Sequence, residues 1–453
     1  MLKKNQEFNL KITGMSNEGS GVGHYDGIAV FVNNTAVGDV ILCHIIKAKK
    51  NYAVGKVVKI LEPSPGRIPS DCDVSLRCGG CCYRHVSYPA ELSYKEQKVR
   101  DAFQRIGHLE VDIQPILGCQ DQIGYRNKAQ YPVAMVPGHG PQMGFFAKNS
   151  HRIVPCMDCR LQPPAFEQVL KIIRAWMMHY GITCYDERVH KGLIRHIYLR
   201  QGCYTGELMV CLVINGKNVP NTYQLIRELR DSIPEFKTFI LNYNTAKTNV
   251  IMGKEEEVLF GEGFIRDQLL GCTFRISPKS FYQVNTKQAE VLYSKAAELA
   301  QLTKDDILMD LYCGTGTIGL TMASHVKKLY GVEIVPEAVN DAWKNAKENS
   351  IANAEFICGD AAKAADQLQH DGVKPDVILV DPPRKGLAES LVHTIAEFDP
   401  KRVVYVSCDP ATLARDCARF HDLGWETNTV CPVDMFPRTA HVENVVLLSK
   451  KNS

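Results

Sequence analysis

The chain has 453 residues, 45% of them hydrophobic, and is long enough for about two to four domains with well-formed cores. Its 53 basic and 50 acidic residues nearly balance, so overall charge argues neither for nor against a nucleic-acid partner. A polar start, the lack of any membrane-length apolar run and 17 cysteines predict a cytoplasmic protein with reduced thiols, and argue against secretion and membrane insertion.

Residues 1–60 contain short apolar runs separated by glycine, which predict a small antiparallel β-barrel of about five strands. This segment has a local charge excess of +4, from eight lysines and four acidic residues. A proline-rich linker follows at 62–69. Residues 61–275 are predicted to form a mixed α+β central domain, with helices at 89–106 and 164–179.

The central segment contains two groups of cysteines: Cys72, Cys78, Cys81 and Cys82, and then Cys156 and Cys159. The flexible Gly79 and Gly80 would let thiolates of the first group converge on one centre, and the second group offers a distant ligand. Four thiolates suit either zinc or an iron–sulphur cluster, and the spacing leaves both open. Free structural thiols are the alternative.

From residue 276 to 453, alternating strands and helices predict an α/β domain with a Rossmann-like parallel sheet. The strand at 307–311 runs into Gly314-Thr-Gly-Thr-Ile-Gly319, and the strand at 329–333 ends in Glu333, which could accept hydrogen bonds from ribose. The loop alone fits NAD or S-adenosylmethionine. Asp310 before it and the later Asp381-Pro-Pro383 turn favour S-adenosylmethionine, although a solvated strand end and a simple turn would explain the two carboxylates.

A further strand, at 402–406, leads into Ser407-Cys408-Asp409-Pro410. The thiol of Cys408 is therefore expected at the carboxyl edge of the sheet, where open α/β sheets bind ligands. A single buried cysteine is more often a small hydrophobic residue. Beside a nucleoside-binding loop, Cys408 instead suggests thiolate chemistry.

Together these features resemble the RNA uracil-5-methyltransferase family, which makes 5-methyluridine in ribosomal or transfer RNA. The resemblance covers essentially the whole chain, and the barrel resembles the TRAM RNA-binding domain. The matching segments are Phe281-Tyr-Gln-Val-Asn285, Val406-Ser-Cys-Asp-Pro-Ala-Thr-Leu-Ala-Arg415 and His441-Val-Glu-Asn444.

The resemblance implies a role for each matched residue. It implies S-adenosylmethionine contacts at Gln283, Tyr312, Glu333 and Asp381. It also implies a four-iron, four-sulphur (4Fe-4S) cluster on Cys72, Cys78, Cys81 and Cys159. This cluster favours the 23S ribosomal RNA branch of the family, with a transfer-RNA enzyme as the alternative.

The chemistry of uracil explains why this family needs a cysteine and a base. A thiolate that adds to C6 makes C5 nucleophilic toward a methyl sulfonium, and a base must then remove the C5 proton. Cys408 is the expected nucleophile and Glu443 the expected base, with His441 as the alternative base. Phe281 is expected to stack on the flipped uridine, and residues 125–128, Arg195 and Arg200 are expected to face the RNA backbone.

Two other classes of protein share parts of this pattern. An NAD-linked iron–sulphur oxidoreductase would use the same loop and cysteines, and a non-catalytic RNA-binding protein would use the barrel. The second has no need for Cys408 and Glu443 together. The expected partner is RNA, with no membrane, and the chain is expected to be a monomer.

Overall fold

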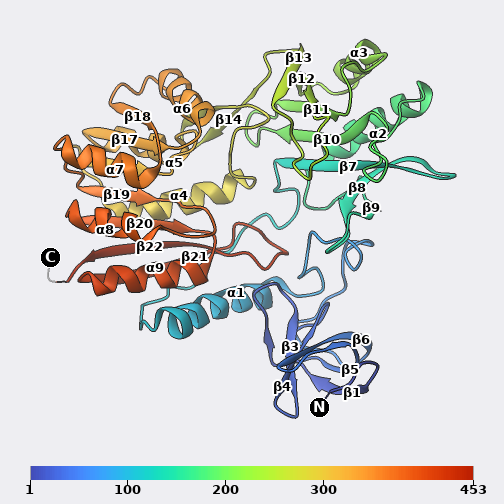
Figure 1. The fold of residues 1–453 in the computed structure, drawn as a ribbon, viewed down its shortest axis with the longest axis horizontal. Helices are drawn as coiled ribbons and strands as arrows, with labels where there is room; N and C mark the ends of the chain where they lie inside the picture. Colours follow the sequence, from blue (N-terminus) through green and yellow to red (C-terminus); the bar gives the residue numbers. More distant parts are fainter. Residues whose placement is uncertain (1, 452–453) are drawn as a thin grey trace.

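The computed structural model describes residues 2–451, and Figure 1 shows a small N-terminal barrel below two larger parts. Within the described residues the barrel sheet has the order β1-β5-β6-β4-β3-β2. Its strands are β1 (Glu7–Lys11), β2 (Gly14–Met15), β3 (Gly21–Tyr25), β4 (Ile28–Val32), β5 (Val40–Ala48) and β6 (Tyr52–Glu62).

The barrel thus has six described strands rather than about five, and β4 pairs with β6 in parallel. The sequence pattern missed the glycine-rich β2 and β3. At Gly23 a Cβ atom would lie 2.5 Å from the carbonyl oxygen of Lys11, so the close approach of neighbouring backbone requires glycine there.

The central part is built on a seven-stranded sheet with the order β13-β12-β11-β10-β7-β8-β9. Helices α2 (Pro164–His179) and α3 (Thr222–Ser232) pack on one face of it. The strands are β7 (Lys128–Val136), β8 (Gly140–Phe146), β9 (Ile153–Pro155), β10 (Ile194–Gln201), β11 (Leu208–Ile214), β12 (Phe236–Tyr243) and β13 (Glu255–Phe260).

Strand β11 is buried along its whole length because both of its faces are covered. Leu208, Val210 and Leu212 pack with α2 and α3, whereas the alternate residues Met209 and Cys211 pack into the core of the C-terminal part. The central and C-terminal parts therefore share a hydrophobic core.

The C-terminal part begins with a hairpin of β14 (Ile265–Leu269) and β15 (Cys272–Ile276) and continues as a second seven-stranded sheet. The order of this sheet is β18-β17-β16-β19-β20-β22-β21. The strands are β16 (Ile307–Leu311), β17 (Lys328–Glu333), β18 (Ala354–Cys358), β19 (Val377–Val380), β20 (Arg402–Ser407), β21 (Trp425–Val433) and β22 (Glu443–Lys450).

The first five of these strands are parallel, and β22 runs antiparallel between β20 and β21. Hydrophobic cores cover both faces of the sheet. The helices are α4 (Thr286–Ala300), α5 (Thr317–Met322), α6 (Pro336–Glu348), α7 (Ala361–His370), α8 (Glu389–Glu397) and α9 (Pro410–Asp422), with a short helix η2 (Ala323–His325).

Helix α1 (Tyr88–Ala102) and the π-helical turn η1 (Phe103–Gly107) lie between the barrel and the central part in sequence. Their apolar residues Val99, Ala102 and Phe103 nevertheless pack into the core of the C-terminal sheet. Figure 1 shows α1 beside α9 and above the barrel, so this helix connects the two ends of the chain. No helix among residues 2–451 has the length and apolar character needed to cross a bilayer.

Candidate active site

Cys408 and Glu443 lie next to each other at the carboxyl edge of the C-terminal sheet. Cys408 follows the last residue of β20, and Glu443 is the first residue of β22. These strands are antiparallel with Ser407 opposite Asn444, so the next step of the register sets Cys408 opposite Glu443. Because β22 runs against its neighbours, its start meets the ends of the parallel strands.

Asp409 stabilises the turn that carries the thiol. It is the N-cap of α9, and its side chain accepts hydrogen bonds from the backbone N–H groups of Ala411 (2.9 Å) and Thr412 (3.1 Å). Pro410 occupies the first turn of the helix, where its missing N–H costs nothing. The half-buried Cys408 is therefore held between a strand end and a capped helix.

Three acidic groups near this point have raised pKa values. Burial, and then the negative charge of Asp381, raises the pKa of Glu443 to about 8, and only 5% of this residue is exposed. Burial raises the pKa of Asp381 to about 7. Burial, with Glu443 and Asp381 nearby, raises the pKa of the Cys408 thiol to about 11. Glu443 can thus exchange a proton near neutral pH, as a general base should.

The glycine loop after β16 is tightly packed against two carboxylates. Asp310 Oδ2 accepts a hydrogen bond from the N–H of Gly319 (3.0 Å), and a Cβ on Gly319 would lie 2.9 Å from that oxygen. Glu333 accepts hydrogen bonds from the N–H groups of Gly314 (3.1 Å) and Val335 (2.8 Å). Both carboxylates are thereby oriented within the loop.

The same loop has two features that are common at ligand-binding sites, a left-handed backbone conformation and a buried polar atom without a partner within residues 2–451. Tyr312 has a φ of 72°, a left-handed conformation that is uncommon outside glycine and often marks functional sites. Asp310 Oδ1 is buried and has no hydrogen-bond partner among the described residues. A buried polar atom without a partner is costly and often marks a functional site, and burial also raises the pKa of Asp310 well above its ordinary value.

Tyr293 of α4 joins the predicted cofactor residues, and the sequence analysis missed it. Its buried hydroxyl group hydrogen-bonds with the side chains of Thr317 (3.4 Å) and Gln283, and its environment includes the charges of Asp381 and Asp310. Gln283 is therefore close to the glycine loop and the Asp381 turn. A core tyrosine on an amphipathic helix carries no sequence signal of this role.

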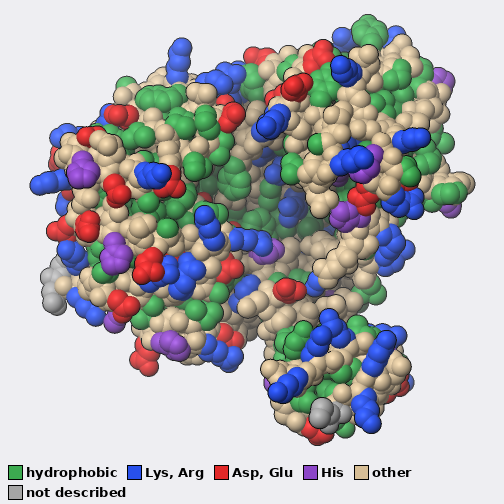
Figure 2. Space-filling model, viewed as in Figure 1, with side chains coloured by type: hydrophobic (Ala, Val, Ile, Leu, Met, Phe, Trp, Pro, Cys, Tyr) green, Lys and Arg blue, Asp and Glu red, His purple; other side chains and the backbone are tan. Residues whose placement is uncertain are grey.

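Cys408 opens into a large cleft with a volume of about 1320 Å³. The cleft is lined by the barrel, the cysteine segment at 75–82, α1 and the loop that precedes Glu443. Arg384 and His441 stand at its edge, with Arg384 Nη2 3.4 Å from His441 Nδ1. Figure 2 shows the molecule hollowed where its three parts meet, and Lys and Arg side chains on the barrel.

His441 is exposed at the rim of the cleft, whereas Glu443 is buried behind it. Partial burial, followed by the positive charges of Arg384 and Lys98, lowers the pKa of His441 to about 4. The imidazole is consequently neutral at pH 7 and a weak base. His441 thus faces two cations at the cleft, whereas Glu443 lies opposite Cys408 at the sheet edge.

The expected RNA-facing residues are largely internal, which corrects that part of the sequence analysis. Arg200 is buried and donates to the carbonyl groups of Ser280 and Tyr282. Arg195 is buried and donates to three carbonyl groups of the loop after β12. A buried arginine bonded to backbone carbonyls stabilises loops, and charge alone could not distinguish this from a surface role.

Two other residues predicted to contact RNA are not among the lining residues of this cleft. Phe281 is 62% exposed, but it does not line the cleft into which Cys408 opens. The hydroxyl group of the buried Tyr125 donates to the carbonyl of Pro437 (2.9 Å), so this side chain supports the loop before Glu443.

The cysteines of the central segment gather in one region. The thiols of Cys72, Cys78 and Cys159 influence one another electrostatically, as do those of Cys78, Cys81 and Cys159. A hydrogen bond with Cys156 lowers the pKa of Cys159 to about 7. Within residues 2–451, however, no group of three or more Cys, His, Asp or Glu side chains has the geometry to hold a metal ion. The donor type fits a metal cluster, and the described geometry does not.

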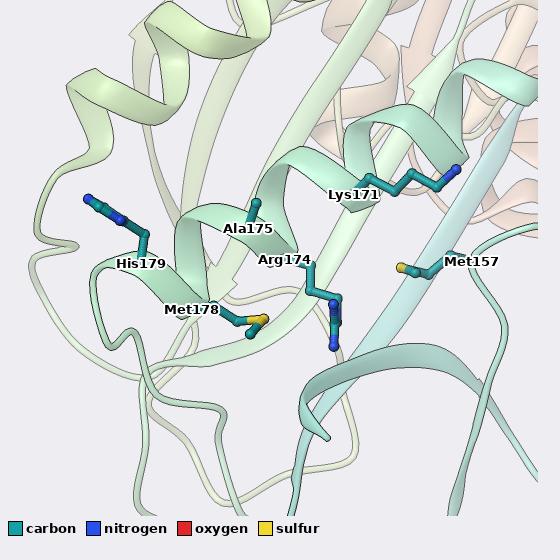
Figure 3. A pocket seen from close by; sticks show the side chains of 6 residues that line it. All are labelled: Met157, Lys171, Arg174, Ala175, Met178 and His179. Carbon is teal, nitrogen blue, oxygen red and sulfur yellow. The ribbon is translucent and has the colours of Figure 1, made fainter. Parts of the chain in front are cut away.

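A second pocket, of about 530 Å³, lies along the outer face of α2 (Figure 3). Met157, Lys171, Arg174 and Met178 are among its lining residues. None of the predicted catalytic or cofactor residues lines it, so it is separate from the site at the sheet edge.

Comparison with known proteins identifies the family. A model described as tRNA (Uracil-5-)-methyltransferase matches residues 182–451, and a TRAM domain model matches residues 2–58. Relatives from Clostridium tetani and Halalkalibacterium halodurans, both named uncharacterized RNA methyltransferases, are 43% identical to this chain. The alignments cover 99% and 100% of this chain and 97% and 98% of the relatives.

A solved structure gives the same result. The chain resembles the Pyrococcus abyssi tRNA (uracil-54, C5)-methyltransferase in complex with S-adenosyl-L-homocysteine, with a TM-score of 0.78 and 27% identity over 97% of this chain and 100% of that one.

The sheet and its carboxyl-edge site are those of an S-adenosylmethionine-dependent methyltransferase fold. More specifically, the chain belongs to the RNA uracil-5-methyltransferase family. The predicted fold and enzyme class are thus confirmed, and neither the NAD-linked oxidoreductase nor the non-catalytic RNA-binding protein remains an alternative.

Proposed function

We propose that this enzyme uses S-adenosylmethionine to methylate C5 of a uridine in 23S ribosomal RNA. The observation that carries the proposal is the position of Cys408 opposite Glu443, beside the glycine loop and open to a cleft. A nucleophile and a base on adjacent strand ends can act on one pyrimidine ring. Because that ring is hidden in folded RNA, the target uridine must be flipped out to reach them.

In the proposed reaction, the thiolate of Cys408 adds to C6 of uracil, and the electron pair of the C5–C6 double bond becomes available at C5. S-adenosylmethionine supplies the methyl group, which C5 takes as the methyl–sulphur bond breaks. Glu443 then removes the C5 proton, the double bond re-forms and the bond between C6 and Cys408 breaks. The Cys408 thiolate, the 5-methyluridine and S-adenosylhomocysteine are released, Glu443 holds the proton, and no oxidant or reductant is needed.

The cofactor would be held by Gln283, Tyr312, Glu333 and Asp381. The oriented carboxylate of Glu333 suits ribose hydroxyl groups, and the unpartnered Asp310 Oδ1 suits a donor on the cofactor or on a bound water. Tyr293 would position Gln283. Asp381, whose charge influences both Cys408 and Glu443, would face the reacting groups.

We also propose that Cys72, Cys78, Cys81 and Cys159 bind a 4Fe-4S cluster. Their spacing in the sequence and their mutual electrostatic influence support it. This cysteine pattern is also what favours ribosomal over transfer RNA.

One experiment tests both the reaction and the RNA class. Purified enzyme and labelled S-adenosylmethionine are incubated with fragments of 23S ribosomal RNA and, separately, with transfer-RNA transcripts. We expect 5-methyluridine in a ribosomal fragment. Product only in transfer RNA would show that the proposed substrate is wrong and the proposed reaction is right. Methylation at a position other than uridine C5 would refute the proposal.

A further inference from the structure

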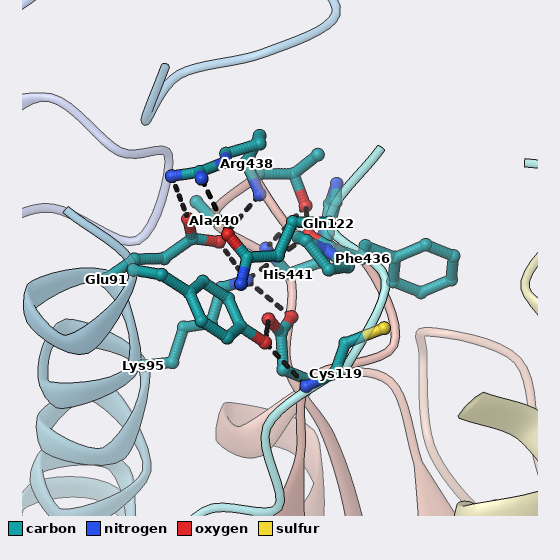
Figure 4. Close-up of polar contacts among 12 residues, drawn as sticks. Glu91, Lys95, Cys119, Gln122, Phe436, Arg438, Ala440 and His441 are labelled. Atoms are coloured by element: carbon teal, nitrogen blue, oxygen red, sulfur yellow. Dashed lines mark hydrogen bonds and ion pairs between the residues drawn. The ribbon is translucent and has the colours of Figure 1, made fainter. Parts of the chain in front are cut away.

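The connection between β21 and β22, residues 434–442, leads directly to Glu443, and we call it the base loop. Figure 4 shows that this loop is held by polar contacts with α1 and the segment after it. These contacts come from residues more than 300 positions earlier in the chain. The base loop is therefore secured largely from outside the methyltransferase sheet.

Lys95 of α1 is at the centre of these contacts. Its ammonium group donates to Glu91 Oε1 (2.7 Å), to Asp434 Oδ1 (2.6 Å) and to the carbonyl of Phe436 (3.2 Å). Lys95 is 1% exposed, and Glu91 and Asp434 are fully buried. These buried ions fix the first residues of the base loop, because removing Lys95 would leave the buried carboxylates of Glu91 and Asp434 without this partner.

The middle of the base loop is fixed by Arg438. This residue has a φ of 72°, and its N–H donates to Glu91 Oε1 (2.7 Å). Its carbonyl accepts from the N–H groups of Cys82 (3.0 Å) and Tyr83 (3.2 Å). The cysteine segment and Glu91, the partner of Lys95, therefore hold Arg438 in a backbone conformation that residues other than glycine rarely adopt.

The opposite end of α1 contacts the nucleophile's helix. In η1, Gly107 packs so closely on α9 that a Cβ atom there would lie 3.0 Å from the carbonyl oxygen of Ala414. Helix α9 starts two residues after Cys408. One helix thus sets the position of the element that carries the nucleophile and of the loop that carries the base.

We propose that Lys95 is a positioning residue for the proton-abstraction step, which it supports by fixing the base loop and hence the carboxylate of Glu443. The inference rests on the proposed function, because it takes Glu443 as the base. Lys95 is 1% exposed, so it acts through the base loop and not by contact with substrate or cofactor. A purely structural ion cluster would instead stabilise the fold and affect every step alike.

The test compares Lys95→Met with Arg195→Met, which removes another buried cation in a different part of the molecule. Single-turnover reactions with labelled S-adenosylmethionine and substrate RNA report methyl transfer. Denaturing gels report the covalent protein–RNA adduct, which persists until the C5 proton is removed and Cys408 is eliminated. For Lys95→Met we expect methyl transfer within about threefold of wild type and elimination slowed about 100-fold, so that methylated adduct accumulates.

Arg195→Met is expected to lower the melting temperature without accumulation of adduct. The double variant Lys95→Met with Asp434→Asn neutralises one of the two carboxylates that Lys95→Met leaves behind, while Glu91 keeps Arg438 at 3.6 Å. It keeps the test valid if the single variant folds poorly. It should still accumulate adduct. Equal slowing of methyl transfer and elimination in both Lys95 variants would overturn the proposal.

Glu443→Gln is run in parallel to separate the two hypotheses. If it accumulates adduct and the Lys95 variants do not, only the role of Lys95 is refuted. If Glu443→Gln also turns over without adduct, the assignment of the base is wrong, and the proposed role of Lys95 falls with it.

Discussion

Cys408 and Glu443 are more costly to ionise in this protein than in water. The raised pKa values of the two groups arise first from burial and then from their neighbouring carboxylates. The free enzyme therefore keeps protons on groups that must lose them during the reaction. Binding of a cofactor that carries positive charge at the sulphur would favour the ionised forms of both groups. Cofactor binding would thus prepare them for the reaction.

The first prediction at the residue scale concerns the nucleophile. RNA with 5-fluorouridine at the target position should become covalently trapped, because fluorine cannot leave as a proton does. Cys408→Ala should form neither adduct nor product, as judged on a denaturing gel and by methyl incorporation. Cys417→Ala removes a fully buried thiol of α9 that has no proposed role, and it should still trap the RNA. Turnover by Cys408→Ala would refute the thiolate mechanism.

A second prediction concerns stability against pH. The pKa of Glu443 is about 8 when folded against an ordinary value of 4.5, so the folded state binds the proton more tightly and loses stability as the pH rises between these values. Glu443→Gln does not titrate. If the difference in free energy of unfolding between the variant and wild type is set to zero at pH 4, the variant should be more stable than wild type by roughly 3–5 kcal/mol above pH 8.

Denaturant unfolding without cofactor at pH 4, 6 and 9 measures this effect. Glu426→Gln, an exposed residue of β21, is the matched control and should show no such trend. A stability difference for Glu443→Gln that stays constant with pH would mean that Glu443 is not a destabilised carboxylate.

The third residue-scale prediction concerns the cofactor. Glu333→Ala should weaken S-adenosylmethionine binding by roughly 1.5–3 kcal/mol, because a charged hydrogen-bond acceptor is lost. Glu337→Ala, in the first turn of α6, removes a nearby exposed carboxylate and should leave the affinity unchanged. Calorimetry measures both, and equal affinities for wild type and Glu333→Ala would exclude Glu333 as the ribose ligand.

At the scale of elements, the cysteine segment is a coil held between other parts. Gly79 donates its N–H to the carbonyl of Phe146 (3.2 Å), and Cys82 donates to Arg438 of the base loop (3.0 Å). The segment has no helix or strand of its own between residues 70 and 82. Backbone contacts with other parts hold it, and a cluster bound by its cysteines would add to this dependence on partners outside the segment.

The fourth prediction follows from this dependence. Protein purified without oxygen should hold about four irons per chain and show the broad visible absorption of a 4Fe-4S cluster. Cys81→Ala should lose the iron, whereas Cys82→Ala, one position later and outside the proposed ligand set, should keep it. Stoichiometric zinc without iron would contradict the cluster and leave the methyltransferase assignment intact.

On the scale of the whole molecule, the cleft at Cys408 exists only because the barrel, the cysteine segment and α1 meet the C-terminal sheet. Several exposed cations line it, including Arg77 and Lys148, and the barrel contributes Phe31 and Tyr52. Positive groups and aromatic rings around one groove are the features that single-stranded RNA binds.

The fifth prediction tests this cleft by its electrostatics. Lys148→Ala should weaken RNA binding and reduce the slope of log affinity against log salt by about 0.7 to 0.9, because one phosphate contact is lost. Lys347→Ala on α6 removes an exposed lysine that does not line the cleft, and its slope should match wild type. Identical slopes for wild type and Lys148→Ala would show that RNA does not contact this residue.

Much of this molecule follows from local pattern. The strand at 307–311 and the helix at 164–179 agree with β16 and α2 residue for residue, because apolar periodicity and prolines specify such elements locally. The Cys408 and Glu443 segments were recognisable as motifs. Residues at the ends of parallel strands share one edge of a sheet, so their proximity could also be expected.

Other features depend on contacts between distant parts of the chain. The buried Lys95 reads in the sequence as one more charge on a polar helix, and its partner Asp434 is 339 positions away. Arg195 and Arg200 look like surface cations, yet they are buried against backbone carbonyls. Periodicity shows only which residues of a single helix or strand share an apolar face. Which element covers that side is settled by packing, and in this protein packing brings α1, the cysteine segment and the base loop to the two residues proposed to carry the reaction.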